Sequence, residues 1–247
     1  SGCSSASPPP RLRGWLRSKL SSTMASMTKS RGRLERLITL HSYDSPEEER
    51  ANALTHALGA VAAPVGLVAL IVRSAGEEPL HVVFADALFG LAMLLLYSAS
   101  TFYHLSSEPR LKRLLRLLDH LSIFILIAGT YTPIMARIDA VWADRTLLLV
   151  WLLAAGGIAF KILFWKRFRV LQVLFYLGMG WLAVIRWREL LELLRPGLLV
   201  SMLVGGLLYT VGTLFYATKR LPYYHAIWHL FVLGGSVAFF VGIYAYL

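Results

Sequence analysis

Seven runs of mostly apolar residues divide this chain, and nearly all of them are long enough to cross a lipid bilayer. A spanning helix needs roughly 20 such residues, because the hydrocarbon layer is about 30 Å thick and offers the backbone no hydrogen-bond partner. The fold class that this pattern predicts is all-α and integral to a membrane, a seven-transmembrane helix bundle. We place the helices at 52–72, 81–105, 117–136, 146–164, 170–185, 198–217 and 224–247.

Composition supports a membrane environment. Hydrophobic residues make up 57% of the chain and charged residues only 16%, with a mean hydropathy of +0.60, which is too apolar for a soluble domain of this size. Residues 1–42 differ, since they are rich in Ser, Pro and Arg and contain no spanning run. We expect a basic, disordered tail over 1–42 and the seven-helix domain over 43–247.

The positions of Lys and Arg predict the orientation. Eighteen of these residues fall in the stretch up to Arg50 and in the links after the second, fourth and sixth runs, and six fall in the other links. Positively charged loops stay in the cytoplasm, so we expect the N-terminus inside and the C-terminus on the outer side. With a formal net charge of +11, the basic face suits contact with anionic lipid headgroups rather than nucleic acid.

Four polar residues fall at the same predicted end of three helices. His104 ends the second run, Asp119 begins the third, and His225 and His229 begin the seventh. Because His225 and His229 stand four apart, they share one helix face and can chelate one ion. Ser100, one turn before His104, is placed to hydrogen-bond a ligand or a bound water. The pattern predicts a metal site, while the alternative is histidines that face headgroups and an Asp119 that caps its helix.

Three further features carry smaller expectations. His56 begins the first run at the same end, and either lines the entrance to the site or is a hydrogen-bonded structural histidine. Asp86 lies in the second run toward the outer face, where an intramembrane acid is a functional candidate, but the sequence offers it no evident cation. The segment Ser45-Pro46-Glu47-Glu48 predicts a capping box and a short helix that leads into the first span.

The polar motifs resemble those of a known family. They read Ser100-Thr-Phe-Tyr-His104, Arg116-Leu-Leu-Asp119-His120, Ala128-Gly-Thr-Tyr-Thr-Pro133 and His225-Ala-Ile-Trp-His229-Leu-Phe-Val-Leu-Gly-Gly-Ser236. In this order they resemble the hemolysin III proteins, a branch of the progestin and adipoQ receptor superfamily. The resemblance covers roughly Tyr43 to the C-terminus.

The resemblance implies a Zn²⁺ cofactor near the cytoplasmic face of the bundle. By analogy with the adiponectin receptors, His104, His225 and His229 would bind the zinc, and Asp119 would hold its water as the catalytic residue. It further implies hydrolysis of a lipid amide such as a ceramide, with the lipid substrate inside the bundle, and a bacterial inner (plasma) membrane location. The chain departs from many relatives at Phe239, where they carry a further histidine.

Several function classes are disfavoured. No Walker loop, dinucleotide fingerprint or Gly-x-Ser-x-Gly elbow occurs, and the single Cys3 excludes an intramolecular disulfide and a thiolate metal cluster. Three readings remain: a zinc-dependent membrane hydrolase, a membrane receptor or stress sensor with structural zinc, and a pore-forming cytolysin. Seven apolar spans argue against a secreted toxin, and the short loops argue against an elaborate receptor.

Overall fold

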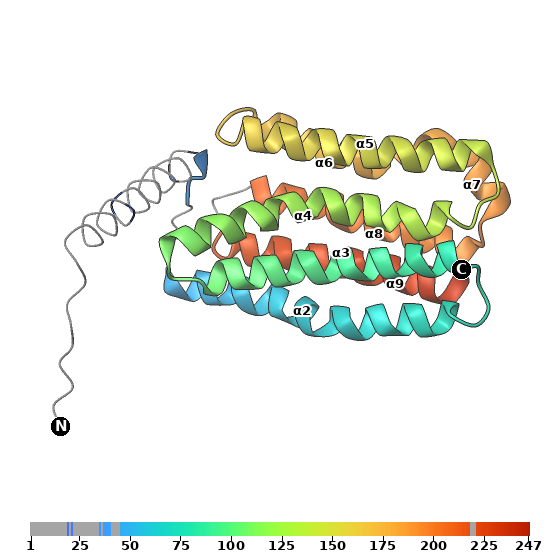
Figure 1. The fold of residues 1–247 in the computed structure, drawn as a ribbon, viewed down its shortest axis with the longest axis horizontal. Coiled ribbons are helices and arrows are strands. Elements are labelled where there is room, and N and C mark those ends of the chain that lie inside the picture. The colour runs from blue at the N-terminus through green and yellow to red at the C-terminus, as the bar shows by residue number, and fades with distance from the viewer. Residues whose placement is uncertain (1–18, 20, 22–34, 36, 41–44, 218–220) are drawn as a thin grey trace, which may run out of the picture.

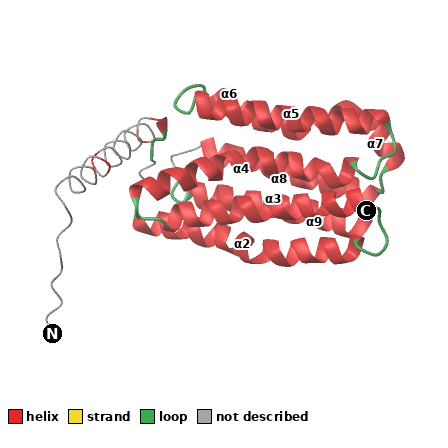
Figure 2. Cartoon of the chain, viewed as in Figure 1, coloured by secondary structure: helices red, strands yellow, loops and turns green. Residues whose placement is uncertain are grey.

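The computed structural model describes residues 19, 21, 35, 37–40, 45–217 and 221–247, and every regular element among them is a helix (Figures 1 and 2). In chain order the elements are α2 Pro46–Ser74, α3 Leu80–Leu105, α4 Pro109–Met135, α5 Val141–Leu163, α6 Arg169–Gly180, a 3-10 helix (η1) Trp181–Arg186, α7 Trp187–Leu193, α8 Pro196–Ala217 and α9 Tyr224–Tyr246. Most of the predicted tail lies outside the described residues, so its boundary at residue 42 stays a prediction.

Seven helical segments are long and apolar enough to cross a membrane, which confirms the predicted seven-helix fold class. The fifth is a composite of α6, η1 and α7 that runs from Val170 to Leu193, so the prediction of 170–185 ended too early. The Tyr131 hydroxyl donates to the Gly180 carbonyl (2.8 Å) and accepts from the Ala183 amide (2.9 Å). This side chain takes up backbone groups where the α-helix changes to the tighter 3-10 form.

Two spans begin earlier than hydropathy alone predicts. Helix α2 begins at Pro46, where the Ser45 hydroxyl accepts a hydrogen bond from the Glu48 amide (3.2 Å), and α4 begins at Pro109 behind Glu108. Both starts combine a side-chain cap with proline at the first position, which lacks the amide hydrogen that would go unbonded there. The helix start predicted at Ser45–Pro46 is confirmed, but it is the beginning of α2 itself and not a separate short helix.

Successive spans run antiparallel, as Figure 1 shows. The starts of α2, α4 and α9 and the end of α3 therefore lie at one end of the bundle, which we call the site end. Helix α3 is the most enclosed span and packs between α2 and α4, while α9 packs between α2 and α8. This arrangement brings the C-terminal turn of α3 close to the first turns of α2 and α9.

The outward faces of the helices are apolar. On α2 a stripe of large side chains is more than half exposed, made up of Leu54, Leu58, Val61, Val65, Val68 and Val72. Such a surface is expected where lipid rather than water surrounds the helix. Buried polar side chains instead lie inside the bundle, mainly on α2, α3, α4 and α9.

Asp86 has the cation that the sequence did not reveal. Arg137, in the link between α4 and α5, bonds the Asp86 carboxylate through both terminal nitrogens, at 2.8 and 2.9 Å, and its Nε lies 3.3 Å from Glu78. Burial alone would lower the pKa of Arg137, but its hydrogen bonds and charge interactions with Asp86 and Glu78 raise that pKa above its ordinary value. The acid is thus half of a buried ion pair.

Candidate metal centre

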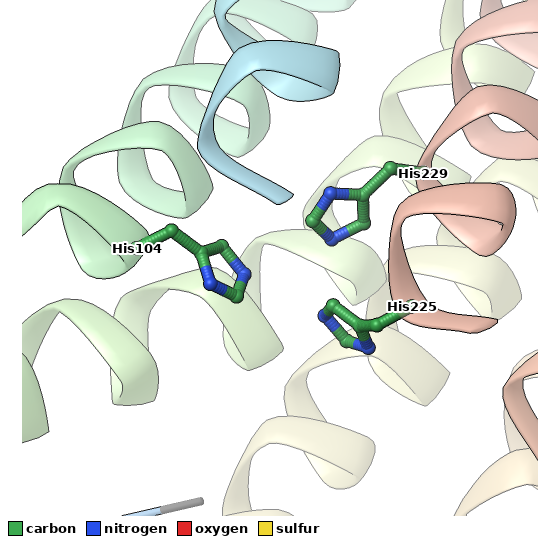
Figure 3. Close-up of side chains that lie close together, drawn as sticks. All are labelled: His104, His225 and His229. Atoms are coloured by element: carbon green, nitrogen blue, oxygen red, sulfur yellow. The ribbon is translucent and has the colours of Figure 1, made fainter. Parts of the chain in front are cut away.

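Three histidines converge at the site end. One nitrogen of each of His104, His225 and His229 lies within 4.8 Å of the others, and all three side chains are buried. Figure 3 shows the rings turned toward one another, His104 from α3 and the other two from α9. A group of this geometry can hold a metal ion, as the sequence predicted.

Local structure explains the convergence. His225 and His229 lie one turn apart on α9, with ring centroids 4.4 Å apart, and the His104 ring lies 5.3 and 5.2 Å from them. His104 lies in the last turn of α3, at the opposite end of that helix from Asp86. Both helices pack against α2, where Glu49 contacts His104 and Asn52 contacts His229.

The hydrogen bonds of two rings fix which nitrogen is available. His104 Nδ1 lies 2.7 Å from the Glu49 carboxylate, and His229 Nδ1 lies 3.0 Å from the Asn52 carbonyl and 3.1 Å from the Thr55 hydroxyl. Carboxylate and carbonyl oxygens only accept, so Nδ1 carries the proton in both rings and Nε2 keeps its lone pair. Neutral imidazoles in this tautomer are what a metal ion requires.

Asp119 stands beside the histidine group rather than in it. It lies in the third turn of α4, its carboxylate is 3.3 Å from Nδ1 of His120, and it interacts electrostatically with His104 and His225. The alternative that Asp119 caps its helix is wrong, because Glu108 is the capping residue. His120 contacts Asp119 and Trp165.

Buried polar atoms around the group fit a bound ion and water. Ser100 is fully buried, and its hydroxyl has no hydrogen-bond partner among the residues that the structure describes. The side-chain amide of Asn52 is likewise buried and has no hydrogen-bond partner among the described residues. Leaving such atoms unbonded costs about 1–3 kcal/mol each, so a polar occupant is favoured there. The predicted place of Ser100 beside the site is consistent with this.

His56 departs from both expectations. It is 3% exposed, so it does not line an entrance, and neither ring nitrogen has a hydrogen-bond partner among the described residues. Its ring instead stacks on His229 and meets Tyr97 edge-on. Its place on α2, 173 positions from His229 in the sequence, left no local signal for this contact.

An apolar cavity, partly open to the outside of the bundle, has walls that include neighbours of the site residues along the chain. It lies between α4, the composite fifth span, α8 and α9, and near the site end its wall includes Ile123 and Trp228. Ile123 is one turn beyond Asp119, and Trp228 directly precedes His229. Phe239 lines the same cavity and stacks on Tyr209, so it contributes an apolar wall.

Comparison with known proteins identifies the family. The profile of the family described as Haemolysin-III related matches residues 45–240. The chain belongs to this family. It is 44% identical to the Hemolysin-3 homolog of Bacillus subtilis (strain 168) over 195 residues, which cover 78% of this chain and 92% of that protein. It is 42% identical to Hemolysin-3 of Bacillus cereus over 195 residues, 78% and 89% of the two chains.

More distant relatives of this haemolysin-III-related protein are adiponectin-receptor-like. The human Monocyte to macrophage differentiation factor is 28% identical over 207 residues, 81% of this chain and 84% of that protein. The region matched by the family profile, residues 45–240, contains the first six spans, most of the seventh and every residue of the histidine group. The family resemblance inferred from the sequence is confirmed, and a multi-pass integral membrane protein is established with it.

Proposed function

We propose that this protein is a zinc-dependent membrane hydrolase that cleaves an amide bond in a lipid. The observation that carries the proposal is the histidine group itself, together with an apolar cavity whose wall includes Trp228, the residue before His229. Three imidazoles suit zinc, and three protein ligands leave a fourth position open, as catalytic zinc sites do. When bound there, zinc would lower the pKa of a coordinated water to about 7 and polarise a carbonyl oxygen.

The chain's own residues supply the remaining chemistry. Asp119 would accept a proton from the attacking water and return it to the leaving amine, and Nδ1 of His120, 3.3 Å away, would orient its carboxylate. The Ser100 hydroxyl is available to donate to the carbonyl oxygen as negative charge develops on it. The apolar cavity would take the acyl chain and exclude water from the reacting groups.

Orientation belongs to the same proposal. We infer that the site end faces the cytoplasm, because the stretches at that end hold most of the Lys and Arg residues. Anionic headgroups would then contact that face. Single cysteines placed at Glu108 and at Glu77, in a Cys3→Ser background, test this by labelling intact bacterial cells with a membrane-impermeant maleimide. Labelling at 77 and protection at 108 are expected, and the reverse pattern would overturn the orientation.

The proposed activity is tested by separating zinc binding from turnover. Asp119→Asn is expected to keep about one zinc per chain and to lose turnover of lipid amides by about 10²- to 10⁴-fold, the usual contribution of a general acid–base group. Asp144→Asn, an exposed acid at the opposite end of the bundle, is the matched control and should leave turnover unchanged. Zinc-loaded wild type that releases no fatty acid from any of a panel of lipid amides would refute the hydrolase and favour structural zinc.

A further inference from the structure

The first turn of α2 contains three consecutive acids with different surroundings. Glu47 is exposed, Glu48 is 8% exposed, and the side chain of Glu49 is 22% exposed. Acids at a helix start are commonly explained by the helix dipole, which they stabilise by about 0.3–1 kcal/mol. That explanation suits Glu47, but it does not require two carboxylates to turn inward toward other helices.

Glu49 contacts the histidine-bearing end of α3. One carboxylate oxygen lies 2.7 Å from Nδ1 of His104, and the other accepts from the Lys112 ammonium at 2.8 Å. Lys112 lies in the first turn of α4 and offsets the cost of holding the Glu49 charge away from water. The result is a Lys–Glu–His chain from three helices that fixes both the tautomer and the direction of the His104 ring.

Glu48 contacts the start of α9. Its carboxylate accepts from the backbone amide of Tyr223 at 2.9 Å. Tyr223 has φ 55°, a left-handed conformation that is unfavourable for a residue with a side chain, and it directly precedes the helix that carries His225 and His229. A charge-assisted hydrogen bond to the Tyr223 amide holds the backbone where α9 begins. It therefore fixes the position of His225 and His229 along the axis of the bundle.

We propose that Glu48 and Glu49 are positioning residues of the metal centre, Glu49 acting through the ring of His104 and Glu48 through the first residue before α9. This inference rests on the proposed metal site but not on any hydrolytic activity. The first turn of α2 thereby positions metal ligands on both α3 and α9. The Asn52 carbonyl and Thr55 hydroxyl on His229 extend the same role one turn deeper.

The test measures zinc affinity by chelator competition and the visible spectrum of the Co²⁺-substituted protein, with thermal unfolding of the metal-free form alongside. Glu49→Ala is expected to weaken zinc binding by about 10- to 100-fold, the range found when a partner of a metal-bound histidine is removed. Its Co²⁺ absorption bands should shift. Glu49→Gln, whose amide oxygen can still accept from Nδ1, should recover part of the affinity. Glu48→Ala is expected to lose about tenfold, and exposed Glu47→Ala is the matched control.

The outcomes separate three accounts. Equal zinc affinity and equal Co²⁺ spectra in wild type, Glu48→Ala and Glu49→Ala would overturn the positioning role, even if these variants melt earlier. Wild type that binds no metal would instead refute the metal centre itself. Weakened zinc binding in Glu49→Ala, with metal-free thermal stability close to that of Glu47→Ala, would establish the positioning role whether or not the protein hydrolyses any lipid.

Discussion

The ring of His56 lies flat against the ring of His229, with centroids 3.5 Å apart and planes inclined by 14°. Because His56 comes from α2 and His229 from α9, the contact supports the histidine group from the side of the first span. A stacked ring can support its neighbour without donating a nitrogen to it. The contact therefore depends on the flat shape of the His56 ring and not on its nitrogens.

Substituting His56 tests whether the shape of its ring or its nitrogens support the site. His56→Phe keeps a flat ring and removes two buried nitrogens, so zinc content should remain at about one per chain and thermal stability should not fall. His56→Ala leaves a gap beside His229 and is expected to cost about 2 kcal/mol of unfolding free energy and to weaken zinc binding. Loss of zinc in purified His56→Phe would show that His56 is itself a ligand.

The Asp86–Arg137 pair predicts a large effect of single substitutions. Arg137→Met leaves the Asp86 carboxylate buried without its cation, which typically costs about 3–5 kcal/mol. Asp86→Asn should cost less, because Arg137 keeps its contact with Glu78. The double variant should be less destabilised than Arg137→Met alone, because it leaves no isolated charge. Thermal unfolding in detergent measures this, and equal, additive losses would contradict the coupling.

The same pair has a defined pH dependence. A base whose pKa is raised on folding stabilises the fold at all pH values below its unfolded pKa, and that contribution is lost only as the pH rises through the folded pKa. Since the pKa of Arg137 is raised above an already high ordinary value, the stability difference between wild type and Arg137→Met should stay constant from about pH 6 to about pH 9. A difference that shrinks steadily toward alkaline pH in this range would argue against the pair.

Two adjacent glycines on α5 give a matched pair of predictions. A Cβ added at Gly157 would collide with the ring of Phe124 on α4, whereas one added at Gly156 would meet nothing within 4 Å. Gly157→Ala is therefore expected to lower unfolding free energy by about 1–3 kcal/mol through overpacking. Gly156→Ala should be neutral or stabilising by up to about 1 kcal/mol, because alanine favours the helix. The reverse order of melting temperatures would contradict the packing of α4 on α5.

The apolar cavity predicts where an acyl chain binds. Gly206, on α8, lines this cavity. Gly178 belongs to the composite fifth span, which forms another wall of the cavity, but Gly178 itself is exposed. A long-chain fatty acid should raise the melting temperature of wild type and of Gly178→Phe, because ligand binding stabilises the folded state. Gly206→Phe fills the cavity and should abolish the shift. An undiminished shift of the melting temperature in Gly206→Phe would show that the acyl chain binds elsewhere.

Much of the fold could be predicted from hydropathy, because a membrane demands long apolar runs and lipid leaves few other solutions. The boundaries were less accessible. Capped polar turns before Asn52 and before Leu117 belong to the helices but carry no apolar signal, and the fifth span changes helix type at Trp181 through a hydrogen bond with distant Tyr131.

The three histidines of the site could be predicted because they fall at one end of their runs in a motif with helical spacing. Their supporting contacts could not. Glu49 stands 55 positions before His104, in a charged stretch that is fully explained by helix capping, and the cation for Asp86 comes from a link 51 positions away. Such pairings depend on which helices pack together, which the chain reveals only when folded.

The central claim is that His104, His225 and His229 hold one zinc ion, and metal analysis by mass spectrometry on detergent-purified protein tests it most directly. Wild type is expected to contain about one zinc per chain, and a His225→Ala/His229→Ala double variant none. His81→Ala, which alters an exposed histidine at the opposite end of the bundle, should retain the metal. Wild type purified without chelators that contains no zinc and takes up none on addition would contradict the account.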